Sequence, residues 1–224
     1  LRALNLPNTQ FTSSNKELIE QADIVIIALK PYNVLSFLEE FKSDFNASKH
    51  TIVSVASGIT ISEMASVLGE NFDIYRAMPN TAAAVSESMT AISVKSDQLN
   101  RKAEVVRLFE SLGEAIIIDE ALMESATILG ACGIAYVLRF IRAMIQGGIE
   151  VGFDAKTATK IVSQTVKGAA ELLIQNGTHP EEEIDKVTTP KGCTIVGLNE
   201  MEHSGFSSAL IKGIVTSYEK IEKK

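Results

Sequence analysis

A polar loop near the carboxyl end of the chain carries residue types suited to holding a small anion. It runs from Val187 to Thr194, and segments with helical apolar periodicity lie on both sides of it. Unpaired N–H groups at the start of a helix favour a carboxylate or phosphate. Gly192 frees the backbone there, and the Thr194 hydroxyl can donate to or accept from a neutral polar atom. The loop is therefore predicted to be a small-anion site, and an ordinary helix N-cap is the alternative.

Three short loops in the first half follow the carboxyl ends of predicted strands. They are Leu29-Lys30-Pro31, Ala56-Ser57-Gly58 and Ala77-Met78-Pro79-Asn80-Thr81. Ligands of open α/β sheets bind at this edge. Gly58 lets a ligand approach the backbone closely, and Asn80 can either lock its loop or contact a ligand. Each loop alone fits simple turn chemistry, but three at one edge favour a binding site.

The remaining titratable side chains show no pattern of acid–base or nucleophilic catalysis. His50, His179 and His203 are scattered, and none has triad-like partners. His179 precedes Pro180 in a capping position, and the acidic run at residues 181–183 is the charge favoured at a helix start. A protein without an evident acid, base or nucleophile points to cofactor chemistry such as hydride transfer, in which the chain mainly binds and orients.

Length, charge and hydropathy narrow the class of protein. The chain has 224 residues, enough for one large domain or two modest ones. Its net charge is −7 without a basic stripe, which argues against nucleic acid or an anionic membrane as a partner. Uninterrupted apolar runs such as Ile24 to Leu29 and Ala115 to Ile118 are far shorter than a bilayer requires. No signal-peptide pattern is visible, although the first residue is Leu1 rather than Met.

The two cysteines, Cys132 and Cys193, form neither a CxxC motif nor a disulfide framework. This usage fits a reducing compartment, so a cytoplasmic location is expected. It also argues against a zinc site, and no metal site is predicted.

Strand-like and helix-like segments alternate over the first half. Continuous β-branched residues after Ala22 predict a strand buried on both faces, as in a parallel sheet between helices, ended by Pro31. Alternation of this kind predicts an α/β sheet with crossover connections. Strands are expected at 22–30, 51–56, 72–76, 89–94 and 115–118, and helices at 1–6, 16–21 (capped by Ser14 or Asn15), 34–45, 62–68 and 99–112 (followed by Gly113 at its C′ position).

The second half lacks strand signals. Apolar residues at steps of three or four predict one long helix from Leu122 to about Gly147. Asp154 caps the next predicted helix, which ends at Gly177, and further helices are expected after Pro180, near Thr194 and from residue 206 to 223. A boundary at about Glu120 thus separates an α/β half from an all-helical half. Long apolar helices pack either against a twin chain or within one chain, and the pattern leaves both open.

Several of these segments together resemble pyrroline-5-carboxylate reductases over nearly the whole chain. The segment from Val187 to Thr194, with Gly205-Phe206, is specific to this family, whereas Ala22-Asp23 to Lys30-Pro31 fits many Rossmann reductases. The other matching segments are Arg76 to Thr81, Gly133 with Ala135-Tyr136-Val137, Gln164-Thr165 with Gly168-Ala169-Ala170, and His179-Pro180.

The resemblance implies a Rossmann-like dinucleotide-binding domain over residues 1–119 and an all-α dimerisation and substrate domain over residues 120–224. The implied reaction is reduction of 1-pyrroline-5-carboxylate to L-proline with NADPH or NADH, the last step of proline biosynthesis. The family's helical half forms an intertwined homodimer, often built into a ring of dimers. Its substrate, a small cyclic imine carboxylate, lies between the nicotinamide and a Pro-Gly-Gly-x-Thr loop.

The same resemblance transfers contacts to individual positions. Asn15 stands where the family contacts the adenosine ribose or phosphate. Thr194 is the expected catalytic residue, with its hydroxyl near the imine nitrogen, while backbone N–H groups hold the carboxylate. The other cofactor-binding positions are Ala28, Leu29, Lys30, Pro31, Ala56, Ser57, Gly58, Met78 and Asn80, and the substrate positions are Lys191, Gly192, Cys193 and Thr194.

The chain departs from the family pattern in three places. The family opens with a strand and a Gly-x-Gly-x-Met-Gly turn that holds the pyrophosphate, and the sequence from Leu1 onward contains neither. Its Ser-Gly-Ser-Gly-Pro-Ala-Tyr motif reads Gly130-Ala131-Cys132-Gly133-Ile134-Ala135-Tyr136 here, which loses two serines and the proline. Loss of the proline predicts a straighter or better hydrogen-bonded helix. Lys191 replaces the first glycine of Pro-Gly-Gly, where a cation can either reinforce carboxylate binding or block the pocket.

Two rival functions follow from these departures. One is a non-catalytic or regulatory dimeric paralogue with a vestigial nucleotide-binding domain; a Gly-x-Gly-x-x-Gly turn encoded upstream of Leu1 would favour the enzyme instead. The other is a reductase of β-hydroxy acids, which needs a catalytic lysine in the first long helix. The stretch from Leu122 to Met144 contains no lysine, which argues against it.

Overall fold

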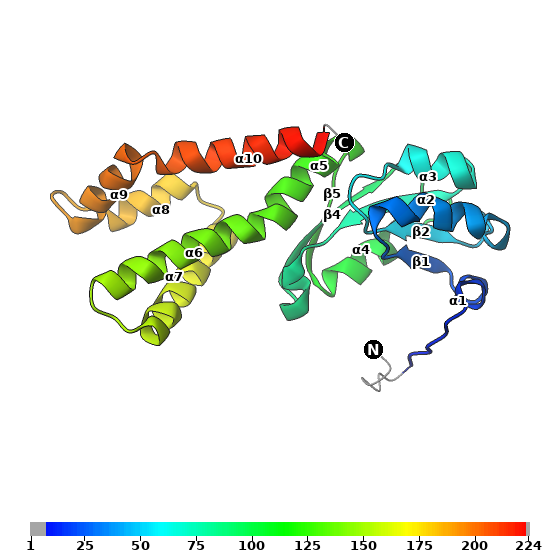
Figure 1. Cartoon of the computed structure of the whole chain (residues 1–224), viewed down its shortest axis with the longest axis horizontal. Helices are drawn as coiled ribbons and strands as arrows, with labels where there is room; N and C mark the ends of the chain where they lie inside the picture. The colour runs from blue at the N-terminus through cyan, green and yellow to red at the C-terminus, as the bar shows by residue number, and fades with distance from the viewer. Residues whose placement is uncertain (1–7, 223–224) are drawn as a thin grey trace. The chain divides into compact units, whose positions relative to one another are not determined.

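The computed structural model describes residues 8–222, which fall into two compact units. Among the described residues, the α/β unit comprises residues 8–131 with residues 220–222, and the helical unit comprises Cys132–Glu219 (Figure 1). The predicted helix at residues 1–6 lies outside the described residues. Residue 120, where the sequence predicts the helical domain to begin, lies inside the α/β unit.

The α/β unit is built on a five-stranded sheet in the order β1-β2-β3-β4-β5. The first three strands are parallel, β4 is antiparallel to β3, and β5 is parallel to β4. The reversal at β4 follows from a short connection, the 3-10 turn Thr81–Val85, which is too short for the crossover that a parallel neighbour needs. The strands are β1 (Ile24–Ile27), β2 (Thr51–Ser54), β3 (Asp73–Met78), β4 (Ser88–Val94) and β5 (Gly113–Ile117).

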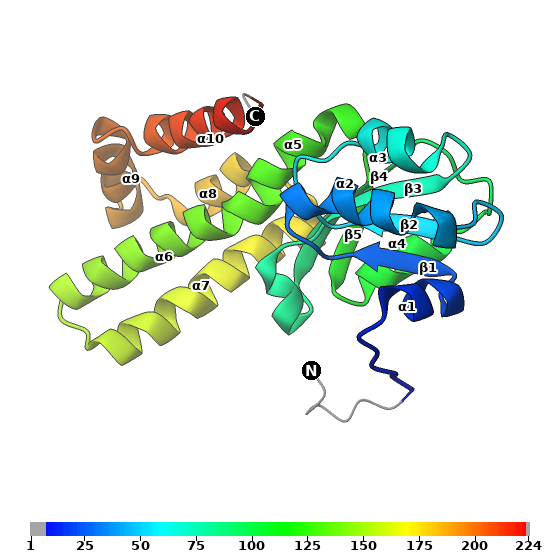
Figure 2. The same cartoon turned by 45° about the vertical axis from the view of Figure 1, so that its right-hand side comes forward.

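Local capping signals explain where the helices of this unit begin. The Ser14 hydroxyl accepts from the backbone N–H of Glu17 at 3.2 Å. Of the two predicted N-caps, Ser14 and Asn15, Ser14 is therefore the one that caps the helix. Thr60 and Glu63 form a capping box at the start of the helix Ile61–Leu68. Pro31 opens a helix at its first turn in addition to ending the strand region. The helices are α1 (Asn15–Gln21), α2 (Pro31–Glu40), α3 (Ile61–Leu68) and α4 (Lys102–Glu110), with a 3-10 turn at Lys42–Asp44 (Figure 2).

Two predictions about individual strand residues are wrong. Strand β1 is not buried on both faces, because Ile26 is 48% exposed while Val25 and Ile27 are buried; β1 is the edge strand of the described sheet and pairs only with β2. Gly113 does not follow a helix as its C′ residue but begins β5 opposite Ser88. A Cβ atom there would overlap the Ser88 backbone, so close strand approach at φ +140° explains the glycine.

The helical unit contains only helices among its described residues. Helices α6 and α7 pack around a small apolar cluster of Ile145, Ala158 and Val162. The predicted caps of α7 are confirmed, because the Asp154 carboxylate accepts from two N–H groups of the first turn and Gly177 follows the last turn at φ +62°. The helices are α6 (Gly133–Glu150), α7 (Ala155–Asn176), α8 (Pro180–Val187), α9 (Cys193–His203) and α10 (Phe206–Glu222).

The predicted long helix is interrupted by a π-helical turn. A 3-10 turn at Glu120–Leu122 leads into α5 (Met123–Ala126), the π turn spans Thr127–Cys132, and α6 follows. The expectation of a straighter or better hydrogen-bonded helix after loss of the proline concerns Ile134, which lies after this turn in the regular helix α6, and it stays a prediction. The π turn forms with Ile134 in the proline position, so it does not require a proline ring. Its Gly130 carbonyl instead accepts from the Asn80 side chain at 3.2 Å.

One helical stretch has the length and hydropathy of a membrane-spanning helix. It covers Glu120–Glu150, with a mean hydropathy of 1.7 in its most apolar window, of which 11% is buried. A search of the sequence for uninterrupted apolar runs does not find this stretch, because polar residues divide it into short segments. Apolar core helices of soluble proteins pass the same test, so the stretch by itself is weak evidence for a membrane.

Candidate active site

The three predicted ligand loops begin at one edge of the sheet. Strands β1 to β3 are parallel neighbours, with Ile27 aligned to Ser54 and Ser54 aligned to Arg76. Their carboxyl ends therefore lie side by side (Figure 2). The predicted cofactor positions that lie on these loops or at the end of β3 are Ala28, Leu29, Lys30, Pro31, Ala56, Ser57, Gly58, Met78 and Asn80.

Two residues of these loops suit a phosphate-bearing dinucleotide. Lys30 is exposed and makes no ion pair within residues 8–222, so its ammonium is available to an anion. It is also the N-cap residue of α2, with no side-chain capping bond. Gly58 has φ +72° and only open space where a Cβ would stand, so a ligand can approach its backbone. The loops thus fit the cofactor, and the binding roles of their residues stay a prediction.

Asn80 locks its own loop. Its Oδ1 accepts from the Ala82 N–H at 2.9 Å, its Nδ2 donates to the Gly130 carbonyl at 3.2 Å, and its N–H donates to the Ser88 hydroxyl at 3.0 Å. The first of the two predicted roles is therefore confirmed by the geometry. An amide group has further hydrogen-bonding capacity beyond these contacts, so a ligand contact stays a prediction.

Asn15 is placed differently from the loop residues. It is the exposed first residue of α1, directly after the cap Ser14. Because α1 leads into β1, its position is consistent with a contact to an outer part of the dinucleotide, which stays a prediction.

A buried ion cluster next to these loops was not predicted from the sequence. Arg76 of β3 is 3% exposed, and its guanidinium contacts Glu120 at 3.2 Å and Glu124 at 2.7 Å. The Arg76 Nε and the Glu124 Oε2 are buried without a partner. A charged residue inside an apolar strand, with two carboxylates one helical turn apart elsewhere, is the signal that would have revealed the cluster.

The predicted anion loop of the helical unit contains a tight turn. The Gly192 N–H donates to the Thr189 carbonyl at 2.8 Å, with Pro190 and Lys191 between them and Lys191 at φ +63°. A proline followed by a residue of positive φ is the type II arrangement. A Cβ at Gly192 would lie 2.5 Å from the Thr189 hydroxyl oxygen, so this position requires glycine.

The first turn of α9 offers free donors. Its N-cap residue is Gly192, which has no side chain to cap the helix. Thr194 is exposed, and its hydroxyl makes no hydrogen bond within the described part of the chain. Thr194 is therefore not an ordinary N-cap, and the exposed N–H groups and hydroxyl keep the geometry of an anion site. All four predicted substrate residues lie together in this turn.

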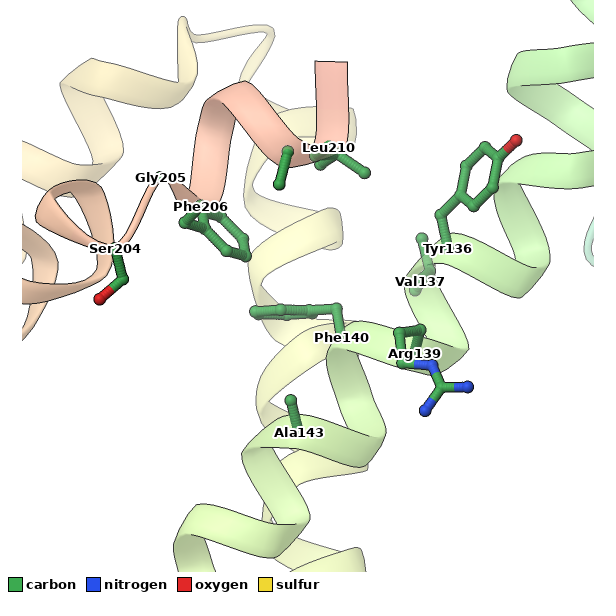
Figure 3. Close-up of a pocket in the computed structure, with 10 residues that line it drawn as sticks. Tyr136, Val137, Arg139, Phe140, Ala143, Ser204, Gly205, Phe206 and Leu210 are labelled. Atoms are coloured by element: carbon green, nitrogen blue, oxygen red, sulfur yellow. The ribbon is translucent and has the colours of Figure 1, made fainter. Parts of the chain in front are cut away.

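An apolar groove in the helical unit is a second feature that was not predicted from the sequence. Its volume is about 440 Å³, and the ring centroids of Phe140 and Phe206 lie 6.1 Å apart, with the two rings tilted by 51° (Figure 3). The Tyr136 hydroxyl at one end donates to the Ser217 hydroxyl at 2.7 Å. Aromatic residues one turn apart on α6 are the signal for it. The lining residues are Tyr136, Val137, Arg139, Phe140, Ala143, Ser204, Gly205, Phe206, Ala209 and Leu210.

This fold and these loops define a two-part oxidoreductase of the NAD(P)-dependent class. Residues 3–58 match the family described as NADP oxidoreductase, coenzyme F420-dependent. Residues 120–224 match the family described as pyrroline-5-carboxylate reductase dimerisation. The second match begins at the predicted domain boundary.

Whole proteins of one family match both parts. Pyrroline-5-carboxylate reductase 1 of Dictyostelium discoideum is 46% identical over 93% of this chain and 40% of its own length. Pyrroline-5-carboxylate reductase 2 of the same organism is 46% identical over 96% of this chain and 76% of its own length. The solved pyrroline carboxylate reductase of Plasmodium falciparum, with NADP bound, is 29% identical, covers 97% of this chain and 84% of its own, and superposes with a TM-score of 0.85. The chain therefore belongs to the pyrroline-5-carboxylate reductase family.

Membership confirms the resemblance and the fold class expected from the sequence. Relatives named as reductases support an enzyme rather than the non-catalytic paralogue. The match to a dimerisation family supports a homodimer.

Proposed function

We propose that the protein reduces 1-pyrroline-5-carboxylate to L-proline with NADPH or NADH. Family membership across both units carries this proposal, since the relatives that match most of the chain are named for this activity. The site geometry supports it, because loops suited to a dinucleotide and a turn suited to a carboxylate are both present.

The α/β unit holds the cofactor. When bound, the dinucleotide supplies the hydride that reduces the imine carbon. Lys30 and the neighbouring loop backbone hold phosphate, and Gly58 leaves room for close approach. Ala56, Ser57, Met78 and Asn80 would hold the nicotinamide end of the bound cofactor.

The turn before α9 holds the substrate. The free N–H groups of Cys193 and Thr194 bind the carboxylate, helped by the helix dipole. The Thr194 hydroxyl hydrogen-bonds near the imine nitrogen, whose proton comes from solvent or from an already protonated substrate. The Lys191 ammonium lies on the same turn and adds positive charge for the carboxylate.

Assembly and location complete the proposal. The protein works in the cytoplasm, without a nucleic-acid or membrane partner, and its dimers join into a ring. The net charge of −7 supports the absence of anionic partners, and the apolar side chains exposed on the helical unit support burial against further copies.

Oxidation of reduced nicotinamide by the intact natural protein tests this function. Turnover is expected with 1-pyrroline-5-carboxylate, and kcat/KM is expected to fall at least tenfold with 1-pyrroline, which lacks the carboxylate. A mixture without substrate controls for slow loss of the cofactor. Absence of turnover at saturating cofactor would reject the function.

A further inference from the structure

One carboxylate oxygen in the α/β unit joins the two loops assigned to the nicotinamide end. Glu120 Oε1 accepts from the backbone N–H of Ile61 at 2.7 Å and from the Arg76 guanidinium at 3.2 Å. These donors adjoin different loops, because Ile61 begins α3 after the loop with Gly58, whereas Arg76 lies on β3 two residues before Met78. Displacement of either Ile61 or Arg76 would therefore break a contact with the same atom.

The surroundings make this contact specific. Arg76 is buried, so its guanidinium cannot exchange Glu120 for water without cost. The Ile61 N–H belongs to the first turn of α3, where a carboxylate is favoured by the free N–H groups and the helix dipole. Asn80 adds a further tie between the β3 loop and residues after Glu120, through the Gly130 carbonyl.

We propose that Glu120 is a positioning residue for the reduction, acting by fixing the loops at residues 56–58 and 78–80 relative to each other. This inference rests on the proposed function, because it assumes that these loops hold the nicotinamide end of the cofactor. Misplacement of a bound reactant by about 1 Å is enough to lower a rate by two orders of magnitude. Glu120 itself touches neither cofactor nor substrate in this account.

Glu124 provides a matched control within the same cluster. It is a glutamate of similar exposure, 24% against 31% for Glu120, and it binds the same guanidinium at 2.7 Å. Within residues 8–222, no hydrogen bond or ion pair joins Glu124 to Ile61 or to residues 56–58, and its second oxygen has no hydrogen-bond partner. Removal of either glutamate leaves Arg76 paired with the other, so the two variants differ chiefly in the link to Ile61.

The test compares E120A, E120Q and E124A in the intact protein. E120A is expected to weaken NADPH binding and lower kcat at least fivefold each, measured by nicotinamide fluorescence and steady-state kinetics at a temperature where circular dichroism shows folded protein. E120Q retains an acceptor oxygen and is expected to stay within about threefold of wild type. E124A is expected to change both quantities less than twofold. If E120A does not fold, E120D replaces it, because its carboxylate falls one methylene short of Ile61.

Equal effects of E120A and E124A would overturn the proposal, since a merely structural cluster predicts them. An E120A protein within twofold of wild type, or an E120Q protein as impaired as E120A, would overturn it as well. Cofactor binding is measured without substrate, so the comparison survives if the wild type binds NADPH but does not reduce 1-pyrroline-5-carboxylate. That last result would reject the proposed function alone.

Discussion

The α/β unit and the helical unit bury their apolar side chains to very different extents. The sheet of the α/β unit has an extensive core on both faces, with fully buried residues such as Ile52, Ile74 and Ile92. The described part of the helical unit has one small buried cluster, around Ile145. Many of its large apolar side chains are exposed, among them Ile174 at 75% and Ile211 at 61%.

This difference indicates where each unit obtains its stability. Buried apolar area is the main favourable term in folding, at about 25 cal/mol for each Å². The α/β unit supplies that area within one chain, as expected for a domain that binds a cofactor. The helical unit leaves it exposed, which fits its match to a dimerisation family and a partner that covers these faces.

Removal of Arg76 is expected to have the largest effect on the free energy of unfolding, and this effect concerns the α/β unit. Arg76→Met leaves the carboxylates of Glu120 and Glu124 close together without their cation. Loss of one partner of a buried ion cluster lowers the free energy of unfolding by about 3 kcal/mol. Urea unfolding followed by circular dichroism measures the loss, and light scattering should show an unchanged dimer. A loss under about 1 kcal/mol would contradict burial of the cluster, because it is the size expected for a solvent-exposed ion pair.

A charge placed in the groove of the helical unit tests whether a second copy of the chain covers this apolar face. Leu210→Glu places a carboxylate on a surface expected to be covered by a second copy, and should raise the dimer dissociation constant at least 100-fold, equivalent to about 2.7 kcal/mol. Analytical ultracentrifugation measures this constant. Leu108→Glu on α4 is the control, because Leu108 is 42% exposed and Leu210 is 43% exposed. Equal effects of both changes, or none, would contradict a partner on this face.

The hydroxyl of Thr194 tests the chemistry assigned to the helical unit. Thr194→Ala is expected to lower kcat/KM for the imine more than tenfold, about 1.4 kcal/mol of lost transition-state contact. Thr188→Ala in the same loop is the control, because the Thr188 hydroxyl is already bonded to the Ile184 and Asp185 carbonyls at 3.2 Å. An unchanged kcat/KM in Thr194→Ala would remove this residue from the mechanism.

His50 makes the stability of the α/β unit sensitive to acid. Burial of the imidazole lowers its pKa below the usual 6.5, with the positive charge of Lys49 as a further cause. Below pH 6.5 the unfolded chain binds a proton that the folded chain resists, so stability falls as pH falls, by at most about 1.4 kcal/mol for each pH unit. Urea unfolding at pH 7.5 and 5.5 measures the loss, which His50→Gln should reduce. An equal loss in wild type and variant would exclude His50 as the cause.

The smallest effect on stability is expected from relieving backbone strain at Lys191. Asn100, which also has a positive φ but lies in the α/β unit, serves as the comparison. Lys191 has φ +63° in the type II turn, a conformation that costs a residue with a Cβ about 1 kcal/mol. Lys191→Gly should therefore raise the free energy of unfolding by up to about 1 kcal/mol, while weakening substrate binding if the ammonium assists the carboxylate. Asn100→Gly, at φ +54° in the α/β unit, should change stability less, because asparagine tolerates this region. Differential scanning calorimetry compares them, and a destabilised Lys191→Gly protein would contradict the assignment of strain.

Features set by neighbouring residues could be predicted from the sequence, whereas long-range features could not. Strand–helix alternation, the caps Ser14 and Asp154 and the loops at the sheet edge each depend on a few adjacent residues. The bond from Asn80 to Gly130 and the Arg76 cluster depend on segments far apart in the chain. The family resemblance supplied the candidate cofactor and substrate positions, but it did not include the cluster that joins their supporting loops.

The most direct test of the account is the steady-state rate of reduced nicotinamide oxidation by the intact natural protein with 1-pyrroline-5-carboxylate. Saturable turnover is expected, with L-proline formed in equal amount to the cofactor oxidised and a kcat/KM that falls more than tenfold in Thr194→Ala. No L-proline from a folded protein at saturating cofactor and substrate would contradict it.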